Sequence, residues 1–112
     1  MATSNKLVND IHKIVIWSLK LNLTNDVQTD CPQRAERMGW LGDAWLSSES
    51  AALNFNMLRF YEKFVKDMMG AQKEDGALPD VVPPYWEIYP ADPAWGTAMI
   101  YIPWVVYKLN GI

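Results

Sequence analysis

Apolar side chains recur every three or four residues near the start of the chain. Leu7, Ile11 and Ile14 fall on one face of a helix, and the lysines of that segment lie elsewhere on it. Ser4 precedes the segment and is a good helix N-cap residue. The pattern predicts a first helix over about residues 5–21.

A segment rich in helix breakers follows, "DCPQRAERMGWLGD", from position 30 to position 43. Pro32, Gly39 and Gly42 are incompatible with one continuous helix, so we predict a loop. Asp43 stands where the N-cap of a second helix is expected. This second helix leads to a predicted interruption near Asn54 and Asn56.

A third apolar stripe, which includes Phe60, Phe64 and Met68, predicts a core-facing helix that runs to about Lys73. Turn residues then lead into "ALPDVVPPYWEIYPAD", which contains four prolines and shows no periodicity. A loop of more than about 12 to 15 residues within a compact domain is usually functional or disordered. The aromatic residues in this one indicate a packed or ligand-facing loop.

The last segment is rich in residues that favour strands, but its flanking residues favour a helix. Asp92 occupies an N-cap position, Pro93 the first helical position, and Gly111 follows the end. We predict one helix between them, kinked near Pro103 and buried on several sides because it is apolar nearly all round. The predicted fold class is therefore mostly α, with antiparallel helical hairpins and a long Pro/aromatic loop.

Composition narrows the possible partners. The 112 residues are enough for a single domain, and a net charge of -3 with a pI near 5.0 gives no basic surface for nucleic acid. No apolar run reaches the ~18 to 20 residues of a membrane span, and positions 1–9 lack the features of a signal peptide, so we expect no membrane partner and a cytoplasmic location for the chain as supplied. One cysteine, Cys31, and one histidine, His12, predict neither a disulfide nor a metal site.

The loop at positions 30–43 combines carboxylates, guanidinium groups and an indole. These residues are Asp30, Arg34, Glu36, Arg37, Trp40 and Asp43. Arginines lower the pKa of the acids they contact, whereas an apolar ring raises the pKa of an acid that it desolvates. Such a loop can keep one carboxyl group protonated and others ionised, as a glycosidase requires, but an ordinary salt-bridged loop has the same composition.

Several segments taken in order resemble the start of the catalytic domain of bacterial α-L-rhamnosidases, which are inverting glycoside hydrolases with an (α/α)6 barrel. They are "TDCPQRAERMGWLGDAW", "AALNF", "DGALPDVVP", "AWGTA" and "IPWVVYKLNG". The resemblance covers nearly the whole chain. It implies that residues 1–112 form a single unit, about one third of such a barrel, and that their partner is a rhamnose-containing glycoside.

The resemblance also implies roles for individual residues. Glu36 matches the general acid, which makes it the candidate catalytic residue, and no cofactor is expected. The positions that match sugar-binding residues are Asp30, Arg34, Trp40, Asp43 and Trp95. The catalytic base of the family is expected downstream of this chain, and Ala35 and Thr97 each stand where the family usually carries Asp.

Three functional classes remain open from the sequence. The chain is either a rhamnosidase fragment that is inactive alone, a non-catalytic carbohydrate-binding module, or a self-associating helical domain. The apolar last helix and the six tryptophans indicate a homo-oligomer or a missing remainder of the barrel. The sequence also leaves open what the loop aromatics Tyr85, Trp86 and Tyr89 do. They suit a buried lid over the core and an exposed platform for a sugar equally well.

Overall fold

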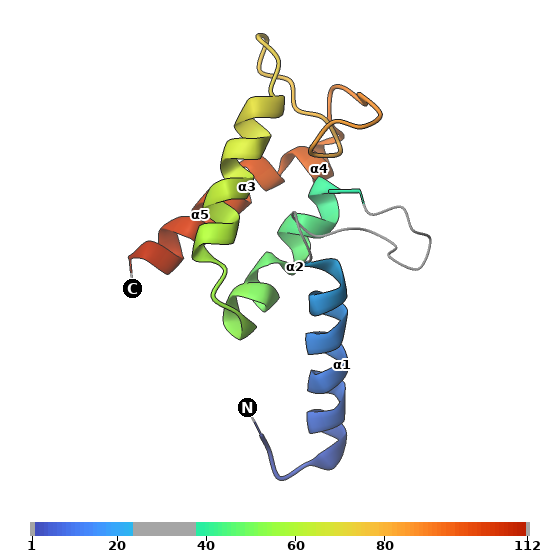
Figure 1. The fold of residues 1–112 in the computed structure, drawn as a ribbon, viewed down its shortest axis with the longest axis vertical. Helices are drawn as coiled ribbons and strands as arrows, with labels where there is room; N and C mark the ends of the chain where they lie inside the picture. Colours follow the sequence, from blue (N-terminus) through green and yellow to red (C-terminus); the bar gives the residue numbers. More distant parts are fainter. Residues whose placement is uncertain (1, 24–37, 112) are drawn as a thin grey trace.

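The computed structural model describes residues 2–23 and 38–111, and this part of the chain is built from helices (Figure 1). The helices are α1 Lys6–Asn22, α2 Leu41–Asn54, α3 Leu58–Ala71, α4 Pro93–Gly96 and α5 Ala98–Asn110. The described residues contain no strand, only one isolated β-bridge. The mostly α class predicted from the sequence is confirmed.

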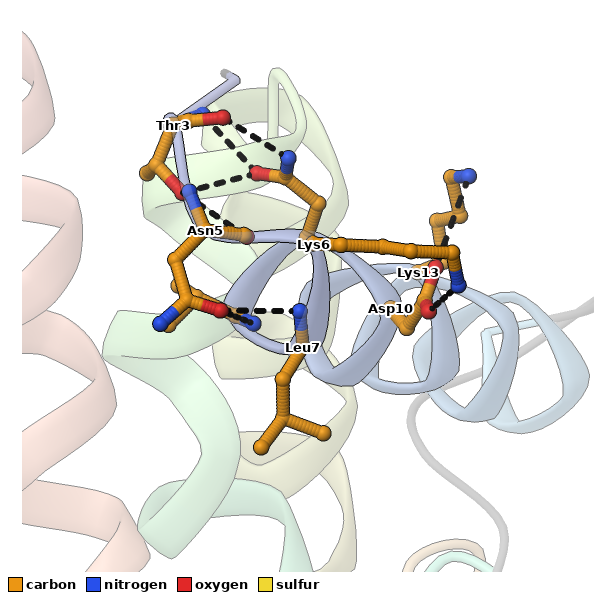
Figure 2. Close-up of polar contacts among 8 residues, drawn as sticks. Thr3, Asn5, Lys6, Leu7, Asp10 and Lys13 are labelled. Atoms are coloured by element: carbon orange, nitrogen blue, oxygen red, sulfur yellow. Dashed lines mark hydrogen bonds and ion pairs between the residues drawn. The ribbon is translucent and has the colours of Figure 1, made fainter.

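The N-cap of helix α1 lies one residue later than predicted. The side chain of Asn5, rather than that of Ser4, accepts hydrogen bonds from the backbone N–H groups of Leu7 and Val8. Ser4 was therefore the wrong N-cap, because the chain turns into the helix only after Asn5. Figure 2 shows this cap, together with Asp10, which forms ion pairs with two lysines on the same helix.

Helix α1 projects away from the body formed by α2, α3 and α5 (Figure 1). Leu19 is its one buried residue, so most of its apolar face is exposed. His12 lies on this helix and contacts α2 through a 2.9 Å hydrogen-bonding distance between its Nε2 and Oδ1 of Asn54. It is therefore a paired polar residue at a helix contact.

Helix α2 begins at Leu41, two residues before the predicted N-cap. Asp43 consequently lies within the first turn, and Trp40 occupies the N-cap position without a side-chain hydrogen bond. The prediction that Asp43 caps this helix was wrong, because the N–H of Leu41 already finds an acceptor in Asp80, far along the chain. A carboxylate in the first turn is still stabilised by the helix dipole.

Helix α3 faces the core with a narrow stripe of buried residues and packs mainly against α5. Tyr61, Phe64 and Met68 are buried on α3, and the Tyr61 hydroxyl donates to the carbonyl of Ser48 in α2 at 3.3 Å. Burial raises the pKa of this tyrosine far above its ordinary value. The predicted stripe and the predicted interruption near Asn54 are both confirmed.

The predicted last helix is divided in two. Asp92 caps α4 as expected, since its side chain accepts from Ala94 N–H at 3.0 Å. The division lies at Thr97, whose hydroxyl donates to the Pro93 carbonyl at 2.8 Å, whereas α5 continues through Pro103. The prediction of one continuous helix was therefore wrong, because the helix is interrupted where a side chain competes for its backbone carbonyl.

Helix α5 is buried on one side only in this chain. Ala98, Ile102 and Val105 are buried against α2 and α3, whereas Ile100 is 78% exposed and Trp104 is half exposed. The expectation of burial on several sides is thus not met within the described residues. An uncovered apolar face remains on α5, as on α1.

One polar contact joins the outer surfaces of α2 and α5. Lys108 forms an ion pair with Glu49, and Tyr101 also hydrogen-bonds to Glu49. The hydrogen bond from Lys108 is the main reason why the pKa of Glu49 is lowered. The bond to Glu49 also raises the pKa of Lys108 and of Tyr101.

We predict that the Glu49 contact makes part of the stability dependent on pH in the acid range. A lowered folded pKa means that the contribution is complete above the ordinary value of 4.5 and is lost as the pH falls through the folded value. Glu49→Gln should therefore destabilise the chain slightly at neutral pH, and the difference should vanish in acid. Urea unfolding at several pH values measures this, with Glu74→Gln in an exposed turn as the control. A difference that is independent of pH would contradict the assignment.

Candidate functional site

The structure describes three of the six predicted site residues. Trp40, Asp43 and Trp95 are described, and all three belong to the region where α2 begins and α4 lies beside it (Figure 1). The predicted catalytic Glu36 and the predicted binding residues Asp30 and Arg34 lie outside the described residues. Cys31 and Ala35 lie outside them as well.

The start of α2 is joined to the loop of residues 72–92 by a short antiparallel pairing. Trp40 and Val81 form an isolated bridge, which is flanked by two backbone hydrogen bonds. These bonds run from Leu41 N–H to Asp80 C=O at 3.0 Å and from Val82 N–H to Gly39 C=O at 2.9 Å. We call this pairing the Trp40–Val81 bridge. It fixes the backbone on both sides of a predicted site residue.

The loop is ordered by its own contacts as well as by the bridge. Asp80 Oδ1 accepts from the N–H of Asp92 at 2.8 Å, which ties the middle of the loop to the cap of α4. The hydroxyl of Tyr89 donates to the carbonyl of Ala71 at 2.6 Å and so attaches the loop to the end of α3. Burial, together with the charge of Glu87, raises the pKa of Tyr89. These contacts give the loop a defined position next to α2.

The indole of Trp95 lies directly against the backbone of α2. A Cβ atom added at Gly42 would lie 3.0 Å from Cε2 of Trp95 and 3.1 Å from its Nε1, closer than ordinary packing allows. Trp45 strengthens the same contact, because its Nε1–H donates to the carbonyl of Ala94 in α4 at 2.7 Å. Gly42 is thus a site residue that sequence reasoning treated only as a helix breaker. A glycine next to a motif tryptophan was the available signal for close packing.

Two indole N–H groups near the start of α2 have no acceptor among the described residues. Nε1 of Trp40 and Nε1 of Trp95 are both buried, and neither forms a hydrogen bond in the part of the chain that the structure describes. Leaving a buried donor unpaired costs about 1–3 kcal/mol. Two such donors at one helix start mark a place where oxygen acceptors, such as hydroxyl or carboxylate groups, would be bound favourably.

The aromatic residues of the loop differ in their surroundings. Trp86 contacts Trp40 with ring centroids 5.7 Å apart, and Tyr85 contacts Trp86 at 5.8 Å. Trp86 is 47% exposed and Tyr85 is 72% exposed, whereas Tyr89 is partly buried against α3. The three aromatics therefore differ. Tyr89 packs against α3, as a lid residue would, whereas Tyr85 and Trp86 face solvent, as a platform would.

Among residues 2–23 and 38–111, no three His, Cys, Asp or Glu side chains come together as a set of metal ligands. No helix in these ranges is long and apolar enough to cross a membrane. The chemistry of the described site is instead that of indole rings and N–H donors beside the Asp43 carboxylate. Asp43 is exposed in the first turn of α2.

Comparisons with known proteins agree on one family. Residues 1–111 match a family model described as the bacterial alpha-L-rhamnosidase 6 hairpin glycosidase domain. The chain is 32% identical over 109 residues to an alpha-L-rhamnosidase of Formosa agariphila, covering 97% of this chain and 12% of that protein. It is 34% identical over 109 residues to an alpha-L-rhamnosidase of Streptomyces avermitilis, covering 97% of this chain and 10% of that protein.

A solved structure gives the same result. The alpha-L-rhamnosidase from Dictyoglumus thermophilum superposes with a TM-score of 0.89 at 56% identity, over 94% of this chain and 12% of that one. The chain thus spans about one eighth of the length of this relative. Its helical arrangement is the one that this segment has in a much longer protein.

The contact between Gly42 and Trp95 predicts a specific sensitivity to substitution. Gly42→Ala should destabilise the chain by about 1–3 kcal/mol, because the new methyl group must displace the indole. Gly70→Ala is the matched control: it lies on α3 with nothing within 4 Å of an added Cβ, and alanine there should stabilise the helix by about 0.5–1 kcal/mol. Urea unfolding measures both variants. If both substitutions changed the free energy of unfolding equally and with the same sign, the close approach of Trp95 to Gly42 would be refuted.

Proposed function

Because the chain belongs to the bacterial α-L-rhamnosidase six-hairpin glycosidase family, we propose that it is the part of such an enzyme that holds rhamnose and supplies the general acid. In this proposal it is a fragment of the catalytic domain. It binds the sugar of a rhamnose-containing glycoside, and the second carboxylate that hydrolysis requires is expected from another part of such an enzyme.

The observation that carries the proposal is the pair of unpaired indole donors. Trp40 and Trp95 match sugar-binding positions of the family, and both have a buried N–H without an acceptor among the described residues. Asp43 lies in the adjoining turn of α2. Sugar hydroxyls are donors as well as acceptors, so indole N–H groups and a carboxylate together complement them.

The proposed roles follow from the chemistry of glycoside cleavage. Glu36 protonates the glycosidic oxygen, a role that needs a carboxyl group whose pKa is raised by apolar surroundings. Asp30, Arg34 and Asp43 bind the rhamnose hydroxyls. Carboxyl groups and water suffice for this reaction, so the proposal includes no cofactor.

Inversion needs a further carboxylate about 6.5–9.5 Å from the acid, on the opposite face of the sugar, to activate water. Family members are expected to provide this base from a part of the protein that follows the matched segment. Thr97, which stands where the family usually has Asp, offers no replacement, because its hydroxyl is bonded to the carbonyl of Pro93 at 2.8 Å. Binding without turnover is therefore proposed for this chain.

We expect this chain to bind methyl α-L-rhamnoside weakly, in the millimolar range, and to release no product from an aryl α-L-rhamnoside above the buffer rate. Removing one member of a catalytic pair usually costs most of the rate. Titration by NMR should shift the indole N–H signals of Trp40 and Trp95, and Asp43→Asn should weaken binding about tenfold or more because a charged hydrogen bond is lost.

The matched control is Asp75→Asn, in the turn after α3 and remote from the start of α2 (Figure 1). It should leave the titration unchanged. Turnover that disappears in Glu36→Gln would refute the proposal of binding without hydrolysis. Shifts that appear only at Trp17 or Trp104 would refute the site itself.

A second candidate function, self-association, has its own observation. Apolar side chains are exposed on two helices: Leu7, Ile11, Ile14, Trp17, Ile100, Trp104 and Tyr107. Exposed apolar surface of this kind usually marks an interface. We propose that these faces are covered either by further copies of this chain or by the remainder of the barrel when that is present.

This proposal predicts a homo-oligomer for the isolated chain at concentrations of tens of micromolar. Ile14→Glu, in the middle of the apolar face of α1, should shift the mass measured by light scattering towards the monomer. Lys13→Glu changes charge at the neighbouring position and serves as the control. A monomeric mass for the unsubstituted chain would contradict self-association without affecting the sugar site.

A further inference from the structure

The exposed aromatic residues of the loop continue outward from the proposed rhamnose site. Trp40 joins the start of α2 to the loop, Trp86 packs on Trp40 with an interplanar angle of 52°, and Tyr85 meets Trp86 edge-on at 74°. Exposure is high at the outer end of this row, at 47% for Trp86 and 72% for Tyr85. We call these three residues the aromatic row.

The row is held in place by the backbone rather than by its own packing. The Trp40–Val81 bridge lies on the chain just before Tyr85, and the Tyr89 hydroxyl bond to α3 lies just after Trp86. Glu87, which follows Trp86, has a φ of 51°, in the left-handed region that non-glycine residues adopt at a cost of about 1–3 kcal/mol. A strained residue next to two exposed aromatics is what a ligand-contacting loop shows more often than a simple connection does.

A second exposed aromatic pair, on α5, has different surroundings from the aromatic row. Trp104 and Tyr107 are stacked at 5.4 Å and 22° on α5. That pair lies on the uncovered apolar face of a helix, with Lys108 beside it. Trp86, in contrast, touches Trp40, one of the residues assigned to rhamnose.

We propose that Trp86, supported by Tyr85, is a platform for the group attached to rhamnose through its glycosidic bond. This inference rests on the proposed function, because it extends the same site outward. The ligand chemistry is a flat apolar face, which either the C–H face of a second pyranose ring or an aromatic aglycone provides. Tryptophan suits this role because it offers a large rigid surface with little loss of conformational freedom on binding.

The test compares three ligands on this chain by NMR titration: methyl α-L-rhamnoside, phenyl α-L-rhamnoside, and a disaccharide of α-L-rhamnose linked to glucose. At least one of the two larger ligands should bind about three- to tenfold tighter than the methyl glycoside, which is the range expected for one aromatic contact. That ligand should also shift the indole N–H signal of Trp86. A gain for phenyl alone identifies an aromatic partner, and a gain for the disaccharide identifies a sugar.

Variants separate the platform from a structural role. Trp86→Ala should remove the gain while leaving the affinity for methyl α-L-rhamnoside within about twofold, Trp86→Phe should retain most of the gain, and Trp104→Ala should retain all of it. A gain that survives in Trp86→Ala, or methyl binding with no gain for either larger ligand, would overturn the platform and leave the rhamnose site standing. Absence of any indole shift with all three glycosides would overturn the platform and the rhamnose site together.

Discussion

The Trp40–Val81 bridge is the constraint on which the rest of the site depends. Its two backbone hydrogen bonds join the start of α2 to a loop about forty residues further along the chain. Because the N–H of Leu41 is satisfied by the Asp80 carbonyl, α2 can begin without a side-chain cap, and Trp40 is left outside the helix. The same pairing brings Trp86 into contact with Trp40 and Asp80 into contact with the N–H of Asp92, which caps α4.

The close packing at the start of α2 contrasts with the exposed apolar surface on other helices. Gly42 admits the Trp95 indole against α2, and two indole donors remain unpaired among the described residues. On α1 and the outer side of α5, by contrast, large apolar residues face solvent. The chain is similar to a segment that makes up about one eighth of a solved alpha-L-rhamnosidase. In the proposed function, the first feature belongs to a sugar site and the second to the core of a larger fold.

Elements set by neighbouring residues were predictable from the sequence. The core stripe of α3, the interruption after Asn54 and the Asp92 cap all depend on contacts within a few residues. Features set by distant partners were missed. Asp43 was mistaken for a cap because the acceptor for the Leu41 N–H lies in the loop. The close contact of Gly42 was missed because its partner, Trp95, lies more than fifty positions along the chain. The family resemblance selected Trp40, Asp43 and Trp95, and the structure places them where α2 begins and α4 lies. The roles of Glu36, Asp30 and Arg34 remain proposals.

The central claim is that rhamnose binds at the start of α2, against Trp40 and Trp95. The most direct test is a nuclear Overhauser measurement between the methyl protons of L-rhamnose and the assigned indole protons of the tryptophans in this chain. The account predicts contacts to Trp40 and Trp95. Contacts confined to Trp17 on α1 or to Trp104 on α5 would contradict it.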